Sequence, residues 1–144
     1  MARERFQGRF PQDLLYDIRA DVWVRRSGDE LTIGATSYGA HFAGEILAFT
    51  PKRVGAEIEA ERSIGVVEVA KTMVAIHAPL ALRIAAINDD AVQRPALINH
   101  DPYGAGWLVR ATPLRWKLES VQLVGREAYV AHVLAAEPDA EIAA

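Results

Sequence analysis

A single lysine interrupts an apolar, β-rich stretch in the middle of the chain. Lys71 stands between two runs of small and β-branched residues in GVVEVAKTMVAIHAP, residues 65–79. The runs 64–70 and 73–78 each suit a strand, so the pattern predicts a hairpin with Lys71 at or beside its tip. Hairpin tips are exposed and lysine is rarely buried, so spacing by itself favours a solvated amine without a chemical role.

The residue types of common catalytic sites occur without the spacing that catalysis needs. The chain has no Cys, which excludes a disulfide framework, a thiolate nucleophile and a cysteine metal site. His41, His77, His100 and His132 lack the i, i+4 pairing and the neighbouring carboxylates of a zinc site. There is also no G-x-S-x-G elbow and no Gly-rich phosphate loop. The sequence predicts no catalytic residue and no metal site, so any redox chemistry has to come from a cofactor.

Strand patterns dominate the first two thirds of the chain and would position the lysine hairpin. Residues 22–26 and 30–36 are β-rich and are joined by the polar turn Ser27-Gly28-Asp29, which predicts a hairpin. After it, Ser37 is expected to cap a short helix. The pattern further predicts three strands and a C-terminal helix, at 54–60, 80–87, 106–112 and 126–137.

Composition sets the broad class. The 144 residues, 51% of them hydrophobic and 24% charged, suffice for one packed domain and are too few for two. The net charge of -3 and the pI near 5.8 argue against a nucleic-acid partner. No apolar run approaches the length of a membrane span, and the N-terminus lacks the apolar centre of a signal peptide. We expect a cytoplasmic protein with no nucleic-acid or membrane partner.

Several motifs resemble, in their order, the glycine-cleavage H protein and its relatives. GVVEVAK, with Pro79 eight residues after Lys71, resembles the attachment hairpin of that family. The H-protein order is also followed by FPQDLLYD, GDELTIGATSYGAHFAGEI, TPKRVGAEIEA and the closing REAYVAHVLAAE. The most specific run is LINHDPYGAGWL at 97–108. The resemblance covers about residues 10–136.

The resemblance implies that Lys71 carries covalently attached lipoic acid and that the protein is a non-catalytic carrier. Amide formation removes the ammonium charge, so the arm can lie against an apolar surface. The five-membered dithiolane holds its S–S torsion far below the roughly 85 to 100° of a relaxed disulfide, so it opens easily. Glu68 is similar to the acidic residue that lipoyl-attaching enzymes meet in this family, although a strand residue facing water needs no such role. Biotin carriers place Met on both sides of the lysine, whereas Ala70 and Thr72 stand here.

The chain departs from the H-protein pattern around the expected arm. Val74 and Ala75 stand where the family has a Ser-Asp pair, and residues 20–23 keep only the tryptophan of a His-Glu-Trp motif. A Ser-Gly-Glu turn becomes residues 81–83, and Glu61 replaces a glycine. Since Leu and Glu avoid the positive φ that Gly accepts, these turns are expected to have different backbone angles.

Three functions fit these departures. We favour a specialised lipoate-binding protein of bacterial sulfur oxidation, whose arm shuttles intermediates with a heterodisulfide-reductase-like complex. The alternative is a glycine cleavage system H protein that carries the aminomethyl group, and a second alternative is an H-like module that binds a partner and is never lipoylated. The expected partners are a lipoyl-attaching ligase or transferase, dihydrolipoyl dehydrogenase, and either that complex or the glycine-cleavage enzymes.

The expected fold is mainly β. The resemblance implies a flattened antiparallel sandwich or barrel-sandwich hybrid of the lipoyl-domain type, with short helices and a C-terminal helix, and the density of strands independently suggests it. One carrier domain is expected over 10–137, with flexible termini at 1–9 and 138–144. Trp23 and Trp107 are expected to anchor the core, as large aromatics in strands usually do.

Overall fold

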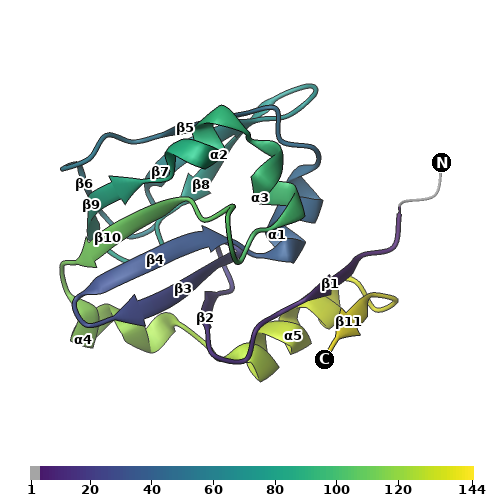
Figure 1. Cartoon of the computed structure of the whole chain (residues 1–144). Helices are drawn as coiled ribbons and strands as arrows, with labels where there is room; N and C mark the ends of the chain where they lie inside the picture. The colour runs from purple at the N-terminus through teal and green to yellow at the C-terminus, as the bar shows by residue number, and fades with distance from the viewer. Residues whose placement is uncertain (1–3) are drawn as a thin grey trace.

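A computed structural model describes residues 4–144 as three β-sheets with short helices at their edges (Figure 1). The strands are β1 Gln7–Arg9, β2 Leu15–Asp17, β3 Val22–Ser27, β4 Glu30–Ala35, β5 Ala48–Pro51, β6 Glu57–Ile58, β7 Ser63–Glu68, β8 Met73–His77, β9 Leu82–Ile87, β10 Val109–Pro113 and β11 Glu141–Ala143. The helices are α1 Ser37–Ala43, α2 Asp89–Gln93, α3 Ala96–His100, α4 Trp116–Glu119, the 3-10 helix η1 Ser120–Gln122 and α5 Arg126–Ala136.

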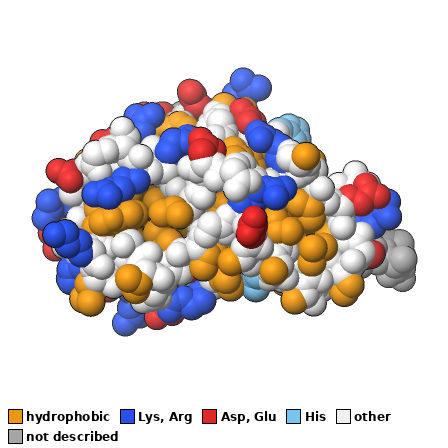
Figure 2. Space-filling view, turned by 90° about the horizontal axis from the view of Figure 1, so that it is seen from below, with side chains coloured by type: hydrophobic (Ala, Val, Ile, Leu, Met, Phe, Trp, Pro, Cys, Tyr) orange, Lys and Arg blue, Asp and Glu red, His pale blue; other side chains and the backbone are white. Residues whose placement is uncertain are grey.

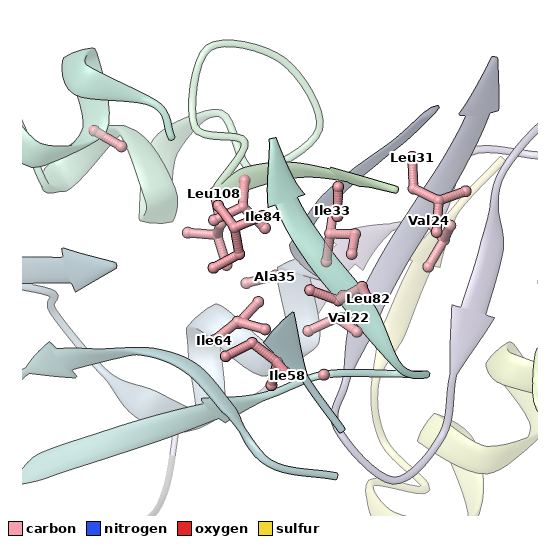
Figure 3. Packing of buried hydrophobic residues seen from close by; sticks show 14 of the residues in the cluster. Val22, Val24, Leu31, Ile33, Ala35, Ile58, Ile64, Leu82, Ile84 and Leu108 are labelled. Atoms are coloured by element: carbon pink, nitrogen blue, oxygen red, sulfur yellow. The ribbon is translucent and has the colours of Figure 1, made fainter. Parts of the chain in front are cut away.

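Two antiparallel sheets enclose the main core. The larger sheet has six strands in the order β2-β3-β4-β10-β9-β6, and the smaller has three in the order β5-β7-β8. Ile33 and Ile84 from the larger sheet pack with Ile64 of the smaller one, and all three side chains are fully buried (Figure 3). The predicted fold class, a mainly β antiparallel sandwich with short helices and a C-terminal helix, is confirmed.

Strand β3 is apolar at consecutive positions because both of its faces are covered. Val22 and Val24 point into the core between the sheets, whereas Trp23 points into a second, aromatic cluster with Tyr16 and Tyr129. The Trp23 indole N–H donates to the carbonyl oxygen of Pro102 at 3.0 Å, so its one polar atom is paired. The expectation that Trp23 anchors the core is confirmed.

Trp107 has a lesser role than expected. It is only partly buried and packs at the margin of the aromatic cluster. The guanidinium of Arg110 lies 4.5 Å from the centre of the Trp107 ring. This cation–π contact covers one face of the indole. Trp107 is therefore a marginal residue of the cluster rather than a central one.

Two local predictions need correction. Ser37 is the first residue of α1 rather than its cap; the cap is Thr36, whose hydroxyl accepts from the N–H of Gly39 at 2.9 Å. Glu61 keeps the left-handed conformation expected only for glycine, with φ of 71°. An ion pair of 2.6 Å between Glu61 and Arg19 accompanies this strained turn. Leu82, in contrast, lies in strand β9 as its side chain favours.

Two strands are shorter than their patterns predict. The alternation at 54–60 leaves only β6, because Gly55 turns the chain with φ of 91°. The pattern at 106–112 becomes β10, which begins three residues later at Val109. The residues before it form turns in which a Cβ on Gly106 would stand 2.3 Å from the Leu97 carbonyl oxygen. A left-handed turn at Gly55 therefore decides the first boundary, and close backbone approach at Gly106 decides the second.

The chain ends differ from the expectation of flexible termini at 1–9 and 138–144. Strands β1 and β11 pair in parallel, with Gln7 opposite Glu141 (Figure 1). Phe6 is 1% exposed, and Ile142 packs against the same aromatic cluster. Burial of these two side chains explains why the ends join, while residues 1–3 lie outside the described part of the chain.

Gly34 offers a test of this packing. A Cβ at Gly34 would stand 2.5 Å from two atoms of the buried Trp23 ring, so the variant Gly34→Ala should lose about 1 to 3 kcal/mol of unfolding free energy through overpacking. The matched change Gly125→Ala meets no atom within 4 Å, so it should cost only the preference for glycine over alanine at the N-cap of α5, about 0.5 kcal/mol. Urea unfolding of both variants measures the difference, and equal midpoints would contradict the packing described.

Candidate functional site

Lys71 lies in the turn of the β7–β8 hairpin, as the sequence pattern predicts. The strands pair as far as Glu68 and Met73, and the N–H of Val69 donates to the carbonyl oxygen of Thr72 at 3.0 Å. Residues 70–73 are all exposed, and the turn projects from the upper side of the molecule in Figure 1. The amine therefore stands where another protein can reach it.

The hairpin is fixed at its base because β7 is the central strand of its sheet. On one side β7 pairs with β8, and on the other it pairs with β5, where Ala48 stands opposite Glu68. The N–H of Leu47 also donates to the Glu68 carbonyl oxygen at 2.7 Å. Both edges of β7 are thus bonded up to the last residue before the turn, which gives Lys71 a fixed pivot.

Glu68 ends β7 and is exposed, three residues before the lysine. Within residues 4–144 its carboxylate makes no ion pair, and neither does the Lys71 amine. The structure thus leaves both groups available to a partner. The recognition role predicted for Glu68 stays a prediction.

An apolar groove of about 310 Å³ begins at the hairpin turn. Its lining includes Val69 and Thr72 of the turn and continues along one side of β8 through Val74 and Ile76. The lining also includes residues of α1, the two residues before β3 and the first residue of β3, namely Ala40, Ala43, Ala20, Asp21 and Val22. A neutral chain attached to Lys71 would find an apolar surface beside its point of attachment.

Asp21 is the one ionisable residue in the lining of this groove. Its backbone is left-handed, with φ of 54°, which is uncommon for a residue other than glycine. The backbone N–H donates to Asp17 and the carbonyl oxygen accepts from Thr36, each at 3.0 Å. These two bonds hold the strained residue in place, so Asp21 is a candidate functional residue.

The Asp21 carboxylate is the end of a hydrogen-bond chain that starts at helix α1. The N–H of Gly39 donates to the hydroxyl of Thr36, which lies 2.8 Å from the Tyr129 hydroxyl, which in turn donates to Oδ1 of Asp21 at 2.7 Å. His132 Nε2 lies 3.8 Å from the same oxygen. Burial raises the pKa of Asp21 above its ordinary value, against smaller opposing effects of Tyr129 and His132.

Sequence reasoning did not identify Asp21 as a site residue. Its hydrogen-bond partner Tyr129 is 108 positions away, and no local spacing connects the two. The one signal in the sequence is the departure from the His-Glu-Trp motif at residues 20–23. That signal marked a loss of polar groups, whereas the structure places one acidic residue, Asp21, in the lining of the groove.

The four histidines do not form a common site. Among residues 4–144, no three His, Cys, Asp or Glu side chains are grouped so as to hold a metal ion. His41 packs its ring 5.2 Å from that of Phe6, and His132 lies beside Asp21.

Of the described helices, none combines the length and the apolar character that a membrane span requires.

A β-sandwich that presents one exposed lysine on a rigid hairpin, beside an apolar groove, has the architecture of a domain that carries a covalently attached group. The sequence model of the family described as Glycine cleavage H-protein matches residues 14–135. The chain belongs to the glycine cleavage H-protein family. Proteins of this family carry lipoic acid covalently attached to a lysine.

Individual relatives agree with the family match. Glycine cleavage system H protein 5 of Aquifex aeolicus is 36% identical over 107 residues, which cover 72% of each chain. The glycine cleavage system H protein of Mycolicibacterium vanbaalenii is 36% identical over 129 residues, covering 85% of this chain and 95% of that protein. The crystal structure of a glycine cleavage system H protein from Mycobacterium marinum superposes with a TM-score of 0.76 at 29% identity, over 86% of this chain and 98% of that one.

The partly buried carboxylate of Asp21 yields a prediction about stability. Because the folded state raises the pKa of Asp21, its contribution to stability is present below the ordinary pKa of 3.8 and is lost as pH rises through the folded value. The variant Asp21→Asn, which keeps the side-chain shape and tolerates left-handed backbone, should therefore gain unfolding free energy relative to the parent as pH rises from about 3.5 to about 7. Urea unfolding at both pH values measures this, and a relative loss at neutral pH would contradict it.

Proposed function

We propose that this chain is the lipoyl carrier of a glycine cleavage system, with lipoic acid joined by an amide to Lys71. The observation that carries the proposal is the position of Lys71, exposed on a fixed turn at the start of an apolar groove, in a member of the H-protein family. The carrier domain spans about residues 10–137 and has no catalytic residue of its own. Its expected partners are a lipoyl-attaching enzyme, the glycine-cleavage enzymes and dihydrolipoyl dehydrogenase, and its cytoplasmic location stays a prediction.

The groove fits an acylated lysine better than a free one. An ammonium ion loses hydration energy beside apolar walls, whereas the amide of an acyl-lysine is neutral. Lysine and lipoyl chain together span roughly a dozen Å or more, counting about 1.5 Å per single bond. Lipoic acid, when bound, supplies a strained disulfide that opens to accept and release a group. The side chains of Val69 and Val74 provide the surface on which such an arm rests and from which water is excluded.

The Asp21 carboxylate favours a cargo with an amine. A protonated aminomethyl group brings one positive charge into a groove whose lining includes one acidic residue, Asp21. Tyr129 occupies Oδ1 of that carboxylate, and 28% of the Asp21 side chain remains exposed. A cation beside Asp21 offsets the cost of a desolvated negative charge, so the residue suits aminomethyl transport.

Sulfur transport remains a second candidate function. Val74 and Ala75 line the groove where the family has a Ser-Asp pair, and they make the β8 wall apolar. An apolar wall suits a neutral sulfur cargo, which would be exchanged with a heterodisulfide-reductase-like complex. The relatives reported above are named as glycine cleavage system H proteins, so the aminomethyl reading takes precedence.

Lipoylation can be tested by intact mass. Incubation with a lipoate–protein ligase, lipoate and ATP should add one lipoyl group to the parent chain and none to Lys71→Arg, because arginine does not form the amide. Glu68→Gln should slow the modification about tenfold, which corresponds to the roughly 1.5 kcal/mol of one charge-assisted hydrogen bond. An unmodified parent would leave the H-like, never lipoylated partner-binding module as the function.

Cargo can be tested by loading the lipoylated protein. With glycine and the decarboxylating partner enzyme, we expect an aminomethyl group on the arm, and Asp21→Asn should lose this group several-fold faster because the carboxylate no longer pairs with the amine. Lipoylation of Asp21→Asn should match that of the parent. If the arm is not loaded from glycine but is loaded from a sulfane-sulfur donor, the function is sulfur transport instead.

A further inference from the structure

A second hollow borders the lysine turn. It measures about 260 Å³, and its lining includes Lys71 itself, Ala70 of the turn, and Glu45 and Leu47 from the segment between α1 and β5. The apolar groove described above does not include Lys71, Glu45 or Leu47 in its lining. The two hollows share Val69 and Ala43, and the second extends from them to Lys71, Glu45 and Leu47.

The segment that forms this hollow has a fixed backbone. Asn99 bridges it, because its side-chain oxygen accepts from the N–H of Ile46 and its amide donates to the carbonyl oxygen of Gly44, each at 2.9 Å. Ile46 is buried, and the N–H of Leu47 is bonded to Glu68 at the base of the hairpin. Gly44 and Leu47 are therefore held at a constant position relative to the lysine turn.

The side chains of this fixed segment nevertheless face outward. Leu47 is 52% exposed, and Glu45 is exposed beside it. Within residues 4–144 the Glu45 carboxylate has no ion pair, so Glu45, which lines the hollow with Lys71, and Glu68, three residues before the lysine, are two acidic groups without an ion pair. An exposed apolar side chain on a fixed backbone, with carboxylates that have no ion pair nearby, is suited to a partner with an apolar pocket and a basic rim.

We propose that Glu45 and Leu47 form a docking surface for the enzyme that acylates Lys71, with an apolar pocket of that enzyme over Leu47 and a basic side chain against Glu45. The proposal rests on the proposed function. To join the amine to a lipoyl group, the Lys71 nitrogen attacks the acyl carbon of a lipoyl-adenylate, AMP leaves, and the nitrogen releases a proton. The active site must enclose the amine during this step, so the enzyme covers the hollow in which the amine stands.

A distant surface supplies matched controls. Leu118 of α4 is 71% exposed, more than Leu47, and α4 lies at the lower left of Figure 1, away from the lysine turn. Seen from below, the end of the molecule that carries α4 shows apolar side chains among Lys and Arg side chains (Figure 2). Glu127 in the first turn of α5 is likewise exposed and acidic. Leu118→Asp and Glu127→Lys therefore serve as controls for the same substitutions at Leu47 and Glu45, namely Leu47→Asp and Glu45→Lys.

The test is the rate of lipoylation by a lipoate–protein ligase with lipoate and ATP, followed by intact mass. Leu47→Asp and Glu45→Lys should each lower kcat/KM at least tenfold through a higher KM, while Leu118→Asp and Glu127→Lys stay within about twofold of the parent. Acylation of Lys71 by a small activated ester of lipoate, with no enzyme, should be equal in all variants.

Two results would overturn the docking surface. One is modification of Leu47→Asp and Glu45→Lys at the parent rate, which leaves the carrier function intact. The other is an equal loss with the ligase and with the small ester, which would mean that the substitutions disturb the turn itself. Failure of the parent chain to accept lipoate is a different outcome, because it removes the proposed function first.

Discussion

The position of the Lys71 amine depends on the pairing of β7 along both of its edges. A hairpin that is bonded on one side only can twist and bend, whereas β7 is bonded to β5 and β8 as far as Glu68. The same constraint sets the groove, since one wall is β8, and the second hollow, since Leu47 is bonded to the Glu68 carbonyl oxygen. A carrier needs its arm to be flexible and its anchor to be fixed, because a fixed pivot concentrates the mobile group near successive partners.

Asp21, which lines the groove, lowers the stability of the fold. Left-handed backbone and a desolvated carboxylate both oppose folding, and the fold retains them through the bonds to Asp17, Thr36 and Tyr129. Such a residue is expected where function requires it. Tyr129 and Thr36 therefore have two roles: they join α5 and α1 to the larger sheet, and they orient the carboxylate of Asp21, a residue that lines the groove.

The sequence predicts the parts of the site that are local. The hairpin and the place of Lys71 follow from two β-rich runs with two residues between them, and the antiparallel class follows from the density of strands. The resemblance points to the family to which the chain belongs. Asp21 escapes prediction because its partner Tyr129 lies in a different element, and β1 and β11 escape because strands of three residues have no measurable period. These features depend on contacts between residues far apart in the sequence, which local patterns do not show.

Backbone dynamics of the lipoylated protein test the central claim of a fixed anchor most directly. Amide relaxation by NMR should give order parameters near 0.85 for residues 69–72, equal to those of strand β7. In the same spectra, attachment of lipoate should shift the amides of the groove wall at Val69, Thr72 and Val74. Order parameters below about 0.6 in the turn, with no shifts along the groove, would contradict the account.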